Sequence, residues 1–210
     1  MKTLWIVFFL GLMSHFSAFA QSAKDIFEKR EIVFLGIDFS QARFIGSGEF
    51  LNHYEIKNKY IPAWNNLILK ERDKYDVKKY FRMDDVEHEF DVVRALHDDI
   101  DVEEKVINSD YELSEEDIQK AVKEYNFNAD NVDTDKKIGL VFIAEYLMKF
   151  KEDEDIEPIG SYWVTFFDTE SRKVLLTERM KGEPGGFGFR NYWARTYYNV
   201  MQNAKEKVKQ

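Results

Sequence analysis

Apolar and polar residues follow one another along this chain with two different periods, which predict strands and helices. Residues 32–39 form a nearly continuous apolar run, typical of a strand buried on both faces. Residues 86–92 instead alternate between apolar and acidic side chains, and this period of two predicts a half-buried strand. Residues 138–150 carry an apolar or aromatic side chain at every even position, so a third, longer strand is expected there.

Three other segments have helical spacing. The helix after Pro62 places apolar residues one turn apart, and proline is well suited to a first helical turn. Ser114 and Asp117 resemble a capping box, which predicts that a helix begins there and presents an apolar stripe through residues 118–125. Residues 189–201 carry a second stripe, rich in aromatic side chains, and predict a terminal helix that packs against the sheet.

The remaining pattern completes a single α/β arrangement. Residues 162–167 and 174–179 flank the polar turn 168–172 and predict a β-hairpin, while glycines punctuate residues 182–188 before the last helix. Residues 94–113 are dominated by acids and are expected to form a long loop. The predicted order is β-α-β-α-β-β-β-α, a mixed β-sheet with helices packed over one side.

The first twenty residues have the features of a secretion signal. Lys2 supplies a positive start, residues 4–12 are apolar, and Ala18 and Ala20 stand where a signal peptidase reads small residues. The apolar run is short of the ~20 residues that span a bilayer, so a membrane anchor is disfavoured. No cysteine is present to carry a lipid, which argues against a lipoprotein. We therefore expect cleavage after Ala20 and a periplasmic or secreted protein without a membrane span.

Composition limits what the remaining chain can do. Residues 21–210 are expected to form one α/β domain, with residues 94–137 as an acidic insertion that contains one helix. These 190 residues hold 29 Lys and Arg against 39 Asp and Glu, a net charge of −10, and this argues against a nucleic-acid partner. The absence of cysteine excludes disulfides and thiol chemistry. Composition leaves the oligomeric state open.

Histidines near acidic residues raise the question of a metal site. His88 falls on the apolar face of its predicted strand, where a hydrogen-bonded core histidine is more usual, and His97 lies in an acidic run expected to be solvated. Their spacing matches no zinc motif, and residues 98–104 lack the order of a calcium loop. We therefore expect no metal and no cofactor, with a weak divalent-ion site as the minor alternative.

Two places in the sequence could hold a binding site. One is the end of the first strand, a position where α/β folds often place active groups, although no G-x-S-x-G elbow surrounds its serine. The other is the glycine-rich entry to the last helix, whose N–H groups could face an anion, although glycines that simply turn the chain explain it better. The candidate binding residues are Asp38, Ser40, Arg43, Phe187, Arg190 and Asn191. Catalytic residues are not predicted.

The opening and closing segments resemble a group of bacterial envelope domains. An apolar strand that ends in Asp-Phe, as residues 32–39 do, opens such domains. A strand, an Asp-Thr turn, a second strand and an amphipathic helix close them, and residues 162–169, 173–179 and 189–201 are similar to that unit. The group includes the curli-secretion pore protein, the lipoprotein activators of penicillin-binding proteins and the amino-terminal domain of the Tol-system propeller protein. The resemblance implies a module that binds a partner in the envelope.

More specifically, the motifs VFLGIDF and GGFGFRNYW resemble an uncharacterised family of exported proteins from Bacteroidetes-type bacteria. No functional residue is carried over from that family. The function expected from the sequence is therefore an exported soluble module that binds an envelope protein or glycan without catalysis. Two alternatives stay open: an exported hydrolase with carboxylate chemistry, and a small-ligand binder that uses the aromatic C-terminal region.

Overall fold

The fold is known from a computed structural model that describes residues 28, 30–127, 138–150 and 155–207. The proposed signal peptide, its cleavage site, residues 128–137 and residues 151–154 lie outside the described residues. The elements follow in the order β1 (Glu31–Asp38), β2 (Arg43–Ile45), α2 (His53–Glu55), the π-helical turn η1 (Ile56–Tyr60), α3 (Ile61–Lys70), α4 (Val77–Phe81), β3 (Asp85–His88), α5 (Asp91–His97), α6 (Val102–Lys105), β4 (Val106–Ile107), α7 (Glu115–Lys123), β5 (Ile138–Met148), β6 (Ile159–Asp168), β7 (Val174–Gly182) and α8 (Phe189–Lys207).

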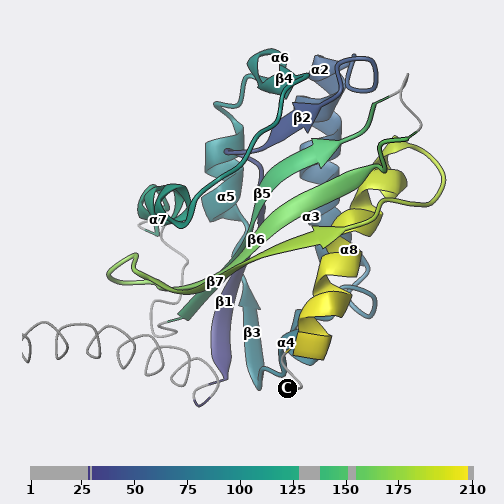
Figure 1. Ribbon diagram of the computed structural model, residues 1–210. Coiled ribbons are helices and arrows are strands. Elements are labelled where there is room, and N and C mark those ends of the chain that lie inside the picture. Colours follow the sequence, from purple (N-terminus) through teal and green to yellow (C-terminus); the bar gives the residue numbers. More distant parts are fainter. Residues whose placement is uncertain (1–27, 29, 128–137, 151–154, 208–210) are drawn as a thin grey trace, which may run out of the picture.

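All described strands belong to one mixed sheet, which confirms the predicted fold class (Figure 1). β1 runs parallel to β3 and β5, and β2 runs parallel to β4 and β5. β6 and β7 extend the sheet in antiparallel fashion beyond β5. β5 is therefore the central strand, and its eleven residues are buried up to Leu147, as expected for a strand covered on both faces.

β1 and β2 lie one after the other along the same edge of β5. Asp38 of β1 is paired with Ile143, and Arg43 of β2 is paired with Tyr146. Residues 39–42 leave the sheet between these two pairs, and the N–H of Ala42 donates to the carbonyl of Phe39 to close a tight turn. The strand edge is thus interrupted rather than ended, and we call residues 39–42 the strand break.

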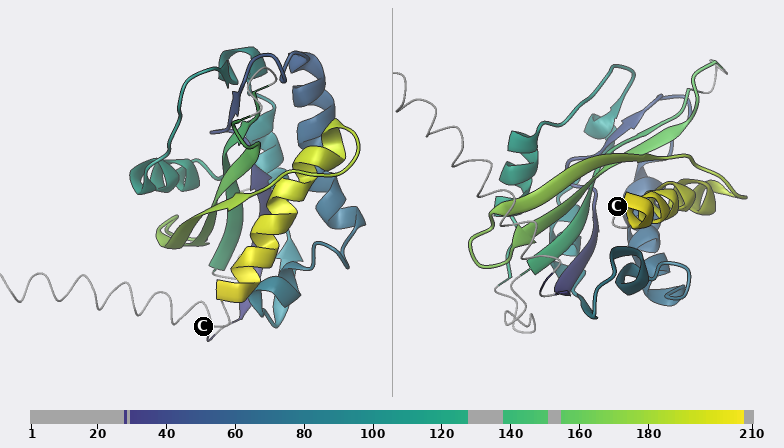
Figure 2. Two further views of the ribbon diagram at one scale, coloured as in Figure 1. Left: turned by 45° about the vertical axis from the view of Figure 1, so that its right-hand side comes forward. Right: turned by 60° about the horizontal axis from the view of Figure 1, so that its bottom comes forward.

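Helices cover both faces of the sheet, so the expectation that they lie over one side is wrong. One face packs against α3, α4 and α8, and its core is rich in aromatic rings. The other face packs against α5 and α7, whose apolar residues meet Val33, Leu35, Val141 and Ile143 of the sheet (Figure 2). Each central strand buries side chains in both directions, and this requires a helical layer on each side.

Two further predictions about local structure are corrected. The strand expected over residues 86–92 ends at His88, and α5 begins at Asp91 and brings the adjacent Val92 and Val93 into the same apolar cluster. The expected loop at 94–113 contains the end of α5 together with α6 and β4, so the acidic segment holds more than one helix. Helices this short are stabilised by tertiary contacts more than by their own spacing.

Other predictions are confirmed. The hairpin forms from β6 and β7, and α7 begins with the capping box in which Ser114 and Asp117 bond to each other's backbone N–H groups. In α8, the side chains of Trp193, Tyr197 and Met201 are almost fully buried against the sheet. The sequence identified these elements because the polar turn, the capping box and the apolar stripe each involve residues that are close together along the chain.

Candidate functional site

The most polar part of the buried core lies at the strand break, at the carboxyl end of β1. Asp38 is fully buried there, and its carboxylate accepts hydrogen bonds from the Tyr125 hydroxyl at 2.9 Å and from the N–H of Ser40 at 2.7 Å. Burial opposes the charged form, but the hydrogen bonds from Ser40 favour it, and the pKa of Asp38 lies below its ordinary value. The site therefore holds a desolvated carboxylate that stays ionised near neutral pH.

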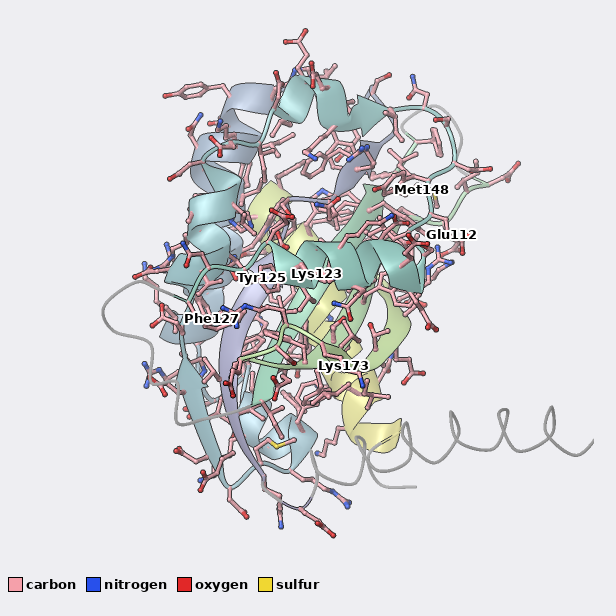
Figure 3. All side chains as sticks on the ribbon, turned by 90° about the vertical axis from the view of Figure 1, so that its left-hand side faces the viewer. Glu112, Lys123, Tyr125, Phe127, Met148 and Lys173 are labelled. Carbon is pink, nitrogen blue, oxygen red and sulfur yellow. The ribbon has the colours of Figure 1, made fainter. Side chains whose placement is uncertain are left out.

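Tyr125 closes this site from the second helical layer. It follows α7 and is itself buried, and Figure 3 shows it at the opposite end of α7 from Glu112. Burial, together with the charge of Asp38 and the hydrogen bond to it, raises the pKa of Tyr125 well above its ordinary value. The phenol stays protonated and acts as a permanent donor to Asp38, which ties α7 to β1.

His97 is part of the same cluster, so the expectation that it is solvated is wrong. The side chain is buried at the end of α5, and its Nε2 accepts the N–H of Phe39 at 2.9 Å. Nε2 also lies 3.7 Å from a carboxylate oxygen of Asp38. In a hydrolase triad one ring nitrogen faces the carboxylate and the other faces the nucleophile, whereas here Nε2 faces both the Phe39 N–H and Asp38. The arrangement of Asp38, His97 and Ser40 is therefore not that of a hydrolase triad.

Cationic and phenolic groups satisfy the carbonyl groups of the strand break. Lys105 donates to the carbonyl of Ser40 at 2.6 Å, and Tyr111 donates to the carbonyl of Gln41 at 3.2 Å. Arg43 bonds to the carbonyls of Gln41 and Ala42 at 3.2 Å, and its guanidinium lies 4.6 Å from the Tyr111 ring centroid. Burial and the nearby Arg43 lower the pKa of Lys105. These contacts stabilise the break and hold its polar groups in a closed arrangement.

A second buried carboxylate, which the sequence did not single out, lies on β5. Glu145 is fully buried and accepts from the N–H of Leu113 at 2.8 Å, the hydroxyl of Ser161 at 2.6 Å and Nε of Arg179 at 2.7 Å. The register shifts between Ala144 and Tyr146, so the even-numbered face expected for this strand is interrupted at Glu145. In the sequence, Glu145 resembles a surface acid. The structure shows that it is buried and paired with Arg179.

An open groove of about 510 Å³ lies beyond the strand break, between α2 with η1 and the loop that follows α5. Lys57 lines this groove and donates to the carbonyl of Asp98 at 2.8 Å. Four carboxylates line the groove against this single lysine: Asp98, Asp99, Asp101 and Glu103. We call it the acidic groove. Its other wall includes His53, Asn58 and the ring of Tyr54, which is 77 % exposed.

Large apolar side chains are exposed at one end of the molecule. Within the described ranges four such side chains are exposed: Leu51 (72 %), Tyr54 (77 %), Ile156 (37 %) and Phe187 (94 %). Tyr54 belongs to α2, and the other three belong to connections at the same end of the sheet, where β2 and β5 finish, β6 begins and the β7–α8 loop lies (Figure 1). We call this surface the exposed apolar end. A gathering of exposed apolar side chains is typical of an interaction site.

Aromatic packing beneath the surface connects these segments. Phe50 contacts Phe189 with ring centroids 6.1 Å apart, and Tyr60 contacts Phe189 at 4.6 Å. Leu51 directly follows Phe50, and Phe187 stands two positions before Phe189. Both exposed residues are therefore close in sequence to a pair of rings that touch each other. The exposed side chains are therefore carried by segments anchored to one another, which gives the surface a defined shape.

The structure separates the six predicted binding residues into two groups. Asp38, Ser40 and Arg43 meet at the strand break, as described above. Phe187, Arg190 and Asn191 lie at the entry to α8, where Arg190 donates to the side chain of Asn191 at 3.0–3.1 Å. The buried Trp64 contacts Phe39 and also donates to the carbonyl of Arg190, so core packing rather than a shared cavity connects the groups.

The glycines before α8 have the turning role expected of them. Gly186 and Gly188 adopt φ values of 100° and 79°, which favour glycine over other residues. The N–H of Tyr192 donates to the carbonyl of Gly188 at 2.9 Å and begins the helix. Phe187 stands between the two glycines at the tip of this turn.

The described part of the chain contains no group of three or more His, Cys, Asp or Glu side chains arranged to hold a metal ion. His88, for which a core position was expected, is half-buried, and its ring lies 5.9 Å from those of Phe34 and Phe90. Burial lowers the pKa of His88 and favours its neutral form. No helix among the described residues has the length and apolar character needed to cross a bilayer.

Comparison with models of known protein families gives no match, and neither does comparison with curated proteins. Among solved structures, the chain is similar to a hypothetical protein, CT253, from Chlamydia trachomatis. The two share 13 % sequence identity and a TM-score of 0.28, and the comparison covers 85 % of this chain and 93 % of the other. A likeness this distant carries no functional argument.

Proposed function

We propose that this protein is an exported, soluble envelope module that binds another envelope protein through its exposed apolar end. The observation that carries the proposal is the position of Leu51, Tyr54, Ile156 and Phe187. All four leave large apolar side chains in water on one end of the molecule, although the two faces of the sheet bury apolar residues efficiently. Tyrosine and phenylalanine are enriched in protein–protein interfaces, where they supply contact area with few rotatable bonds.

The acidic groove supports a preference for one kind of partner. It begins at Tyr54 and carries four carboxylates against one lysine, so it complements a segment that combines basic and apolar side chains. Such charges steer association and reject acidic partners more than they add affinity. The apolar contacts would supply most of the binding energy, and the groove would supply selectivity.

Binding explains the strand break better than hydrolysis does. The break engages its polar groups internally: Nε2 of His97 accepts from the backbone, Lys105 donates to the carbonyl of Ser40, and Asp38 accepts from Tyr125. A catalytic site would keep donors and acceptors free for the substrate. The break acts instead as a rigid support from which α5 and the acidic loop project toward the groove.

A photo-crosslinking experiment in cells of the source organism tests the proposal. A photo-reactive amino acid replaces Tyr54 or Phe187 in the full chain, and Lys78, exposed on α4 at the other end of the molecule, is the matched control position. We expect both test positions to give an adduct of the same mass, the control to give none, and charge reversal at Asp99 and Glu103 to weaken the adduct. N-terminal sequencing of the same material should begin at Gln21.

Two results would contradict the proposal. If neither Tyr54 nor Phe187 forms an adduct, or if Lys78 forms the same one, the exposed apolar end is not the binding surface. If the purified chain retains Met1, it has not been exported by signal cleavage.

A further inference from the structure

A second groove, separate from the exposed apolar end, lies where β7 meets α8. It has a volume of about 590 Å³, within the range of small-ligand sites. Ile159, Gly182 and Glu183 contribute from the sheet side, and α8 contributes the opposite wall. Figures 1 and 2 show α8 lying alongside this end of β7.

Two glycines create the close approach from which this groove opens. Gly160 and Gly182 are paired across β6 and β7, and a side chain at either position would collide with Thr196 of α8. At Gly182 the collision would involve the helix backbone itself. α8 therefore meets the sheet at Thr196, and the helical face next to that contact overhangs the end of β7.

That face of α8 is polar and rich in amides. Residues at positions 195, 198, 199, 202 and 203 have the spacing of one helical stripe. The amide of Asn199 donates to the carbonyl of Glu183 at 2.8 Å, and Gln202 donates to the hydroxyl of Tyr198. Each of these side chains keeps its amide oxygen as an acceptor, and Asn203 is exposed at the edge of the groove. We call this the amide groove.

The charges and rings of the amide groove restrict its ligand. Lys181 and Arg195 face one carboxylate, Glu183, so a neutral or singly negative molecule is favoured. The cations of Arg195 and Lys74 lie 5.5 and 5.4 Å from the Tyr198 ring centroid and would compete with a planar base for this ring. Amide donors and acceptors beside these cations fit a molecule that carries many hydroxyl groups.

We propose that the amide groove binds a saccharide. Its amides accept from sugar hydroxyls, and Arg195 and Lys181 donate to them. The groove is open along its length, so both a free sugar and a residue within a glycan chain can enter. This proposal rests on different residues from the protein-binding surface and stands or falls independently of it.

NMR titration of the full, 15N-labelled protein tests the proposal. The probes are the N-acetylglucosamine tetramer and maltotetraose, each compared with its monosaccharide. We expect saturable shifts in the side-chain amides of Asn199, Gln202 and Asn203. The double variant Gln202→Ala/Asn203→Ala removes two exposed amides and should weaken binding about tenfold, the effect of roughly one lost hydrogen bond or slightly more. Asn108→Ala, which changes an exposed asparagine after β4 outside the groove, should bind as the unmodified protein does.

The outcomes separate the sources of the ligand. Binding of a tetramer with weaker binding of its monosaccharide supports a glycan chain, and equal binding of both supports a free sugar. The proposal is overturned if none of the four probes gives saturable shifts, if the shifts lie outside the amide groove, or if the double variant binds as tightly as Asn108→Ala. Thermal melts of both variants check that loss of binding does not reflect unfolding.

Discussion

The two faces of the sheet are closed by different kinds of interaction. The face under α8 is held by rings: Trp193 packs against Phe50 at 5.3 Å, and Tyr197 packs against Tyr75 at the same distance. The face under α7 adds two buried carboxylates to its apolar packing, since Asp38 bonds to Tyr125 and Glu145 bonds to the N–H of Leu113. Aromatic rings can pack against one another at many angles, whereas hydrogen bonds to a buried charge require donors in particular directions. The second face therefore positions the strand break and the segments beside it.

The largest effect should come from the ring-packed face. Trp193→Ala removes a fully buried indole and leaves a cavity, which should cost about 3–5 kcal/mol of the free energy of unfolding. Arg195→Ala, on the exposed side of the same helix, should cost well under ~1 kcal/mol. Thermal and denaturant melts of the two variants measure the difference. An unmoved melting curve for Trp193→Ala would mean that the ring is not part of the core.

The next effect should come from Glu145. Glu145→Gln keeps the shape and the acceptor for Leu113 but removes the charge that Arg179 needs, and should cost about 2–3 kcal/mol. Glu112→Gln is a matched control, because Glu112 also pairs with Arg179 but its side chain is 71 % exposed. Exposed pairs contribute little, so this control should cost under ~1 kcal/mol. If the two variants lost the same free energy of unfolding, burial would not distinguish the pairing of Glu145 with Arg179 from that of Glu112.

Asp38→Asn should have a smaller effect that depends on pH. Asn keeps an acceptor for Tyr125 but loses the charge, and should cost about 1–2 kcal/mol at neutral pH. Because the folded-state pKa of Asp38 lies below the unfolded value, the charge stabilises the protein above about pH 4, and this stabilisation is lost as the pH falls through the folded pKa. Denaturant melts of both proteins across pH should therefore converge at acidic pH. A gap that widens there would reverse the assigned direction of the pKa shift.

Local pattern predicted the parts of the molecule whose cause is local. The capping box at Ser114, the hairpin and the α8 stripe each depend on residues a few positions apart, and each was confirmed. The strand break depends on partners that are distant in sequence: His97 lies 58 residues from Phe39, and Tyr125 lies 87 residues from Asp38. Asp38 could be singled out because a strand ends there, but nothing near His97 distinguishes a buried histidine from a solvated one. Glu145 was missed for the same reason, because its partners Leu113 and Arg179 lie 32 and 34 residues away in the sequence.

The smallest effect on stability should come from the exposed apolar end, and it separates packing from binding. Phe187→Ala removes a ring that is 94 % exposed between two turning glycines, so the free energy of unfolding should change by less than ~0.5 kcal/mol. Phe189→Ala, two positions away, removes a half-buried ring in contact with Tyr60 and should be clearly destabilising. Partner crosslinking from Tyr54 should nevertheless fall sharply in Phe187→Ala, because a protruding ring contributes only when a partner covers it. Unchanged crosslinking in a fully stable Phe187→Ala protein would remove this side chain from the binding surface and leave Leu51 and Tyr54 to define it.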